Sequence, residues 1–138
     1  MNKSFFIAWV VIFVLWMAGS FVVHHVLLHE QYAKFPTLFR PEAQAQQNFW
    51  LMLLAHVFMA GAFTWIYMRG AEAKPWLGQG LRYGIAVAFL TIVPSYMIHY
   101  VVQPLTADLA FRQIAFDGIL LLVLGAAVAL LTRGHARA

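Results

Sequence analysis

The sequence predicts an all-α integral membrane protein, a four-helix bundle with up-down topology, and three observations predict it. Hydrophobic residues make up 63% of the 138 residues, against roughly 45–50% in soluble domains. Charged residues make up only 10%, too few to cover the surface of a water-soluble domain of this size. The apolar residues also form four long continuous runs, each sufficient to cross about 30 Å of hydrocarbon as a helix.

These runs predict one transmembrane domain over residues 1–138. Transmembrane strands are excluded because the runs do not alternate apolar with polar residues, and an open sheet leaves its backbone unsatisfied in lipid. Lys3 and the small residues of 18–20 also suit a cleaved signal peptide, but the first apolar run continues past them, which favours an uncleaved span. The predicted spans cover about 5–28, 49–68, 83–102 and 107–131, with an outer loop at 29–47.

Lysine and arginine are distributed unequally between the two sides of the predicted membrane. The N-terminus, the second loop and the C-terminus carry six, whereas the first loop and the last hairpin carry three. Because basic residues in short loops favour the cytoplasm, we expect a multi-pass protein of the bacterial inner membrane with both termini cytoplasmic. The six are Lys3, Arg69, Lys74, Arg82, Arg133 and Arg137, and the three are Lys34, Arg40 and Arg112.

A stripe of small and polar residues follows one face of the third span. Its members recur at spacings of four, three and four residues, which places them on one side of a helix, and small residues let helices approach closely in lipid. We expect this stripe to pack against the fourth span, which has a matching small face at Gly118, Gly125 and Ala129, while Pro94 kinks the third helix. The stripe is Gly84, Ala88, Thr91 and Ser95.

Asp117 is the most costly residue in the four spans, because an isolated carboxylate in hydrocarbon costs at least about 2.5–3.5 kcal/mol. Counting ~1.5 Å per helical residue puts it about 14–15 Å from the outer boundary, and His56 about 10–11 Å. We therefore predict a polar core pair of His56 and Asp117. Two interpretations stay open: a hydrogen bond that fixes helix packing, or a site that handles protons or orients a ligand.

The remaining histidines suggest two cofactor hypotheses. His25 and His29 are four residues apart, so that a continuous helix would place both imidazoles on one face, as a Zn²⁺ or Cu²⁺ site requires; Glu30 and His99 are candidates to complete it. His25 and His99 also lie at similar predicted depth, as the axial ligands of a b-type haem would. Covalent c-type haem is excluded because the chain has no cysteine. The alternative is a polar cluster of interfacial histidines.

The segment from His24 to Pro41 resembles a signature of small four-span bacterial membrane proteins of uncharacterised function. The pattern is H-x-x-L-L-x3-Y-x3-P-x-L-[WF]-R-P, and it matches His24, Leu27, Leu28, Tyr32, Pro36, Leu38, Phe39, Arg40 and Pro41. The resemblance implies the four-helix topology and carries no catalytic residue or activity.

The sequence contains no nucleophile–base arrangement, phosphate-binding loop or zinc-protease motif, which favours a non-enzymatic protein. The leading hypothesis is a small accessory or interaction subunit of a membrane complex, with a polar His/Asp cluster in its periplasmic half. The alternative is a metal- or b-haem-binding membrane protein, and the third is a small transporter or channel acting as an oligomer. Expected partners are the lipid bilayer and other membrane subunits or a second copy of the chain. Nucleic acid is not expected, because the basic residues lie singly between apolar runs.

Overall fold

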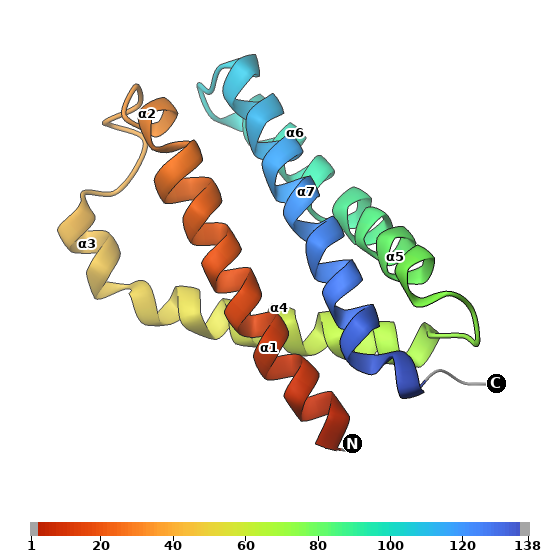
Figure 1. Cartoon of the computed structure of the whole chain (residues 1–138). Helices are drawn as coiled ribbons and strands as arrows, with labels where there is room; N and C mark the ends of the chain where they lie inside the picture. The colour runs from red at the N-terminus through yellow and green to blue at the C-terminus, as the bar shows by residue number, and fades with distance from the viewer. Residues whose placement is uncertain (1–2, 136–138) are drawn as a thin grey trace.

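The computed structural model describes residues 3–135, and every regular element within that range is helical (Figure 1). Four of its helical segments are long and apolar enough to cross a membrane, which confirms the predicted all-α four-helix class. Arg137, counted above among the cytoplasmic charges, lies outside the described residues. The elements are α1 (Lys3–Phe21), η1 (Val22–Leu27), α2 (His29–Tyr32), α3 (Glu42–Gln47), α4 (Phe49–Gly70), α5 (Trp76–Leu90), α6 (Ile92–Val102), α7 (Ala107–Thr132) and η2 (Arg133–His135).

Helix α7 is the centre of the molecule, since it contacts α1, α4, α5 and α6. Figure 1 shows α1 beside α7 and the α5–α6 pair along its other side, while α4 crosses α1 at a steep angle. We call the end that carries residues 28–48 the long-loop end, and the end that carries residues 71–75 the short-loop end. Helix α7 also supplies most of the fully buried large side chains: Leu109, Leu121, Leu124 and Val128.

Glycines bring α5 and α7 into backbone contact. A Cβ atom on Gly80 or Gly125 would overlap the carbonyl oxygen of the other glycine, and one on Gly84 would overlap the carbonyl oxygen of Leu121. Gly84 and Ala88, the first two residues of the predicted stripe, are buried in this contact. Because no side chain separates the two backbones at these positions, α5 and α7 pack closely against each other.

The third span is interrupted at Thr91, and the predicted stripe ends there. Helix α5 stops at Leu90 and α6 starts at Ile92, since Pro94 has no N–H for the carbonyl of Leu90 and its ring would clash with that carbonyl in a continuous helix. Thr91 and Ser95 are therefore exposed instead of packed against α7, and the Thr91 hydroxyl donates to the Val87 carbonyl at 2.7 Å. The prediction that these two residues belong to the packing stripe was wrong.

The first span changes helix type before it leaves the membrane region. After Phe21 the chain continues as the π-helix η1, and the Leu28 amide bonds the Val23 carbonyl, five residues earlier, at 2.9 Å. Single π turns within helices are rare and recur at functional sites. The turn brings Val23 and Leu28 into a small apolar cluster with Leu105 and Leu109, which holds the end of the first span against the start of α7.

Candidate functional site

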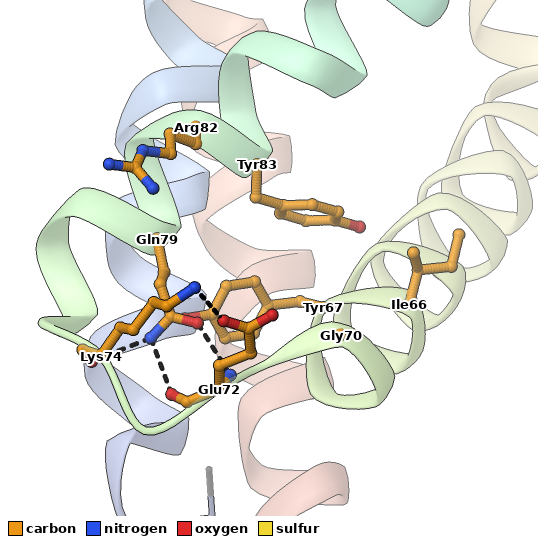
Figure 2. A pocket seen from close by; sticks show the side chains of 8 residues that line it. All are labelled: Ile66, Tyr67, Gly70, Glu72, Lys74, Gln79, Arg82 and Tyr83. Carbon is orange, nitrogen blue, oxygen red and sulfur yellow. Dashed lines mark hydrogen bonds and ion pairs between the residues drawn. The ribbon is translucent and has the colours of Figure 1, made fainter. Parts of the chain in front are cut away.

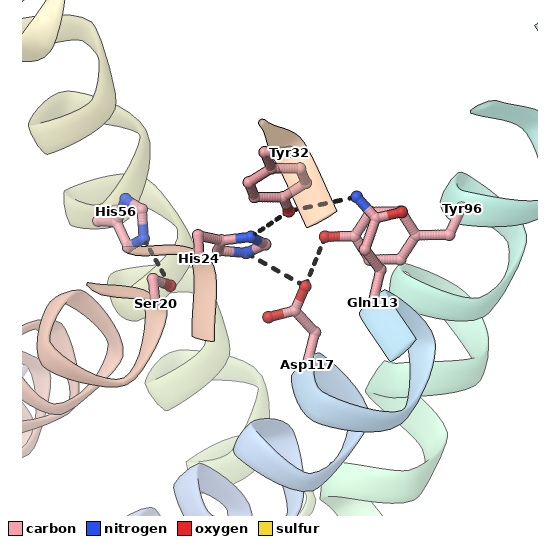
Figure 3. A network of polar contacts seen from close by, with 7 residues as sticks. All are labelled: Ser20, His24, Tyr32, His56, Tyr96, Gln113 and Asp117. Atoms are coloured by element: carbon pink, nitrogen blue, oxygen red, sulfur yellow. Dashed lines mark hydrogen bonds and ion pairs between the residues drawn. The ribbon is translucent and has the colours of Figure 1, made fainter. Parts of the chain in front are cut away.

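A chain of hydrogen bonds joins the end of the first span to α7 and α6 (Figure 3). Its centre is His24, whose Nε2 lies 3.3 Å from Asp117 Oδ2 and whose Nδ1 lies 2.6 Å from the Tyr32 hydroxyl. The Tyr96 hydroxyl donates to the same Asp117 oxygen at 2.5 Å, and Gln113 Nε2 donates to the Tyr32 hydroxyl at 3.3 Å. We call these five residues the His24–Asp117 cluster.

Four elements position the members of the cluster: η1, α2, α6 and α7. The π turn of η1 directs His24 toward α7, and the ring of Tyr32 in α2 stacks on the imidazole with centroids 5.9 Å apart. Gln113 and Asp117 are four residues apart in α7, and each is only 6% exposed. The cluster therefore gives the buried carboxylate the partners that hydrocarbon does not provide.

The predicted direct pair of His56 and Asp117 is not formed among residues 3–135. His56 Nδ1 instead lies 2.8 Å from the Met52 carbonyl of its own helix, and His56 Nε2 lies 3.3 Å from the Ser20 hydroxyl. The carboxylate is taken instead by His24 of η1 and Tyr96 of α6. His56 stays on the steeply crossing α4, so similar depth did not bring it to Asp117.

His56 and Asp117 do line one common cavity of about 400 Å³ between α1, α4, α6 and α7. Its apolar wall is formed by aromatic and methionine side chains, which adapt readily to a bound group. The remaining lining residues are polar, and most of them take part in the hydrogen bonds described above. The apolar wall contains Trp16, Met17, Phe21, Phe49, Met52 and Met59, and the polar wall contains Ser20, His24, His25, His56, Tyr96 and Asp117.

When His24 is neutral, a donor and an acceptor can be assigned to every hydrogen bond of the cluster. An ionised Asp117 only accepts, so His24 must carry its proton on Nε2, which leaves Nδ1 to accept. The Tyr32 hydroxyl then donates to Nδ1 while its oxygen accepts from Gln113. Burial raises the pKa of Tyr32 above its usual value; the Gln113 hydrogen bond opposes this rise and the charge of Asp117 adds to it. The phenol thus keeps the proton that it donates.

A second arrangement of hydrogen bonds is possible when His24 is protonated. Both ring nitrogens then donate, so Tyr32 must accept from Nδ1 and turn its own proton toward another acceptor. Gln113 Oε1 is buried and has no hydrogen-bond partner in the part of the chain that the structure describes. A half-turn of the Gln113 carboxamide brings this oxygen to the position of Nε2, where it accepts from Tyr32. The same five residues can therefore satisfy His24 with or without the additional proton.

The two histidines of the predicted metal site lie on different elements. His25 belongs to the π-helix η1 and stacks on Phe21 with ring centroids 5.1 Å apart, whereas His29 starts α2 after a bend at Leu28. A spacing of four residues does not define one helix face across such a bend. Within residues 3–135 no group of three or more histidines, cysteines or carboxylates, Glu30 and His99 included, gathers to hold a metal ion.

The predicted haem ligands are likewise placed apart. His25 lines the cavity, but His99 is not among the residues that line it; His99 is exposed on α6, with its ring edge-on to Tyr96. A b-type haem needs both imidazoles to face the space that holds the macrocycle. The residues present therefore do not fit a haem between His25 and His99.

Four residues of the cluster were not predicted from the sequence as site residues: His24, Tyr32, Tyr96 and Gln113. Two signals pointed to them. Gln113 precedes Asp117 by four residues and so shares its helix face, and His24 and Tyr32 are two polar positions of the signature segment. Comparison of the chain with protein-family models, with curated proteins and with solved structures finds no match.

Proposed function

We propose that the protein is a small non-enzymatic subunit of a bacterial inner-membrane complex, in which the His24–Asp117 cluster takes up and releases a proton beside an intramembrane cavity. The observation that carries this proposal is the unpartnered Gln113 Oε1. It is the acceptor that the protonated state of His24 requires, and it already lies within the cluster. A purely structural hydrogen bond between His24 and Asp117 would not need it.

The cavity supports the assignment as a subunit. Asp117 and His24 are part of its wall, so a group inserted between α1, α4 and α6 would lie next to the proton that the cluster holds. The first half of α4 exposes large apolar side chains beside this opening, among them Phe49, Trp50 and Met52. A neighbouring membrane subunit or its bound molecule has both apolar surface and a polar end to contact there.

Nitrogen-15 magnetic resonance on the purified, labelled protein tests this proposal. Neutral His24 should carry its proton on Nε2. In a series of samples of decreasing pH, the Gln113 side-chain amide signal should shift together with the signals that report protonation of His24. In Tyr32→Phe the hydroxyl that links them is lost, so Gln113 should no longer follow His24.

Gln79 is the matched control, since its carboxamide is fully hydrogen-bonded at the short-loop end and its signal should stay constant. The proposal would be contradicted if neutral His24 carried its proton on Nδ1, or if the Gln113 amide signal did not change when His24 gains a proton. A haem absorption band or near-stoichiometric metal in the same preparation would replace it with the cofactor-binding alternative.

The orientation of the chain is a separate expectation within this proposal. The six-to-three distribution of basic residues favours cytoplasmic termini, which would place the His24–Asp117 cluster in the periplasmic half. A reporter enzyme that is active only in the cytoplasm should be active when fused after residue 138. A reporter that is active only in the periplasm should be active when inserted in the 29–47 loop, and the reverse pattern would refute the orientation.

A further inference from the structure

A second pocket, of about 300 Å³, lies at the short-loop end between the end of α4 and the start of α5 (Figure 2). It is remote in sequence and in the fold from the His24–Asp117 cluster, and the proposed proton exchange does not use it. Its lining combines apolar groups of α4 with two cationic side chains, Lys74 in the loop and Arg82 on α5. The residues that matter are Ile66, Tyr67, Glu72, Lys74, Gln79 and Arg82.

The loop wall of this pocket is fixed by Gln79. Its Oε1 accepts from the Glu72 amide at 2.8 Å, and its Nε2 donates to the carbonyls of Glu72 and Lys74, each at 2.9 Å. These three bonds, visible in Figure 2, hold residues 72–74 against the first turn of α5. The pocket is thus a formed feature of the chain rather than a gap beside a loose loop.

The charges around the pocket do not cancel. The Lys74 ammonium forms a hydrogen-bonded ion pair with the Glu72 carboxylate. The hydrogen bond and the charge of Lys74 lower the pKa of Glu72 below its usual value, so this carboxylate remains ionised. Arg82 has no ion pair or hydrogen bond from its side chain within residues 3–135. One guanidinium charge is therefore left over in the pocket lining.

The hydroxyl of Tyr67 adds a second free donor. Tyr67 is only 6% exposed, and its ring packs edge-on to Tyr83 with centroids 5.3 Å apart. The Tyr83 hydroxyl is occupied, because it donates to the Phe63 carbonyl at 2.7 Å. The Tyr67 hydroxyl has no hydrogen-bond partner in the described part of the chain and lies in the pocket lining. This hydroxyl is therefore available to donate to an acceptor bound in the pocket.

We infer that this pocket binds the phosphate of an anionic phospholipid headgroup. Arg82 supplies the charge and the paired N–H donors that phosphate oxygens match, and the Tyr67 hydroxyl supplies a further hydrogen-bond donor. Lys74 lies at the rim, already balanced by Glu72. Ile66, which is 52% exposed on the spanning part of α4, offers apolar surface for the first carbons of an acyl chain. That apolar side favours a lipid over a free phosphate ion.

Native mass spectrometry of the purified full chain, titrated with phosphatidylglycerol, measures this binding. The wild type should bind it more tightly than phosphatidylcholine, because the choline cation opposes Arg82. In Arg82→Ala the dissociation constant should rise about tenfold, as expected for loss of a charge-assisted hydrogen bond. Arg133→Ala is the matched control: it removes one positive charge just beyond α7, outside the pocket lining, and should leave the constant unchanged.

Tyr67→Phe separates the pocket from general attraction between a cation and an anionic lipid. It keeps the ring that packs on Tyr83 and removes only the hydroxyl, so the dissociation constant should rise about threefold while the melting temperature stays near that of the wild type. Equal losses in Arg82→Ala and Arg133→Ala, or no change in Tyr67→Phe, would overturn the inference. Displacement of the lipid by an equal concentration of inorganic phosphate would overturn the assignment to a lipid.

Discussion

Replacing Gly125 with valine is expected to lower the free energy of unfolding by about 3 kcal/mol, at the upper end of the usual cost of overpacking. A Cβ at this position would overlap the backbone carbonyl of Gly80. Backbone atoms cannot rotate aside as a flexible side chain does, so α5 and α7 would have to separate. Thermal unfolding of the purified protein in detergent, followed by circular dichroism, measures the loss.

Gly118→Val provides the matched control on the same helix. A Cβ on Gly118 would meet nothing within 4 Å among residues 3–135, and the change in helix propensity is the same for both substitutions. Gly118→Val should therefore leave the melting temperature close to that of the wild type. Equal destabilisation by the two variants would mean that the glycine contact between α5 and α7 does not exist in the membrane protein.

Removing the carboxylate in Asp117→Ala is expected to cost about 1–3 kcal/mol for each buried polar group left unsatisfied. Two groups lose their acceptor, the Tyr96 hydroxyl and the His24 imidazole. Combined with His24→Ala in a double-mutant cycle, Asp117→Ala should show a coupling of about 0.5–3 kcal/mol, as for side chains in direct contact. Thermal unfolding of the two single variants and the double variant gives this coupling.

A parallel cycle with His56→Ala compares the two candidate partners of Asp117. His56 bonds Ser20 and the Met52 carbonyl, so its coupling to Asp117 should be smaller than that of His24. Arg112→Ala is a further control, because Arg112 pairs with Asp108 at 2.8 Å and its effect should add to that of Asp117→Ala within about 0.5 kcal/mol. A larger coupling for His56 than for His24 would restore the pair predicted from depth.

The helices were predictable because their signal is local and continuous. Long apolar runs identify the spans, and Pro94 predicted an irregularity where α5 and α6 meet. The third span begins at Trp76 instead of near Tyr83, because Gln79 and Arg82 interrupt the apolar run although they continue the helix. The steep crossing of α4 depends on how the four helices pack together, so it cannot be predicted from the residues of α4 alone.

The site was predictable only in part. The cost of a carboxylate in lipid identified Asp117, but depth alone could not select its partner. Which imidazole faces α7 depends on the helical phase at the end of the first span, and the π turn of η1 changes that phase. The prediction assumed that the first span remains α-helical through His29, and it therefore selected His25 instead of His24. Tyr32 ends the four-residue helix α2, and how the chain turns after the first span was not predictable from the apolar pattern.

The interruption at Thr91 divides the third span into two helices that are packed to different extents. Helix α5 is held by the glycine contact with α7, so displacing it would open the core. Helix α6 has no fully buried residue along the length that the structure describes, although Ile92 packs against the core as a partly buried side chain. Tyr96 lies on this helix. The hydrogen bond between Tyr96 and Asp117 therefore joins α7 to the half of the third span that is less deeply buried in the molecule.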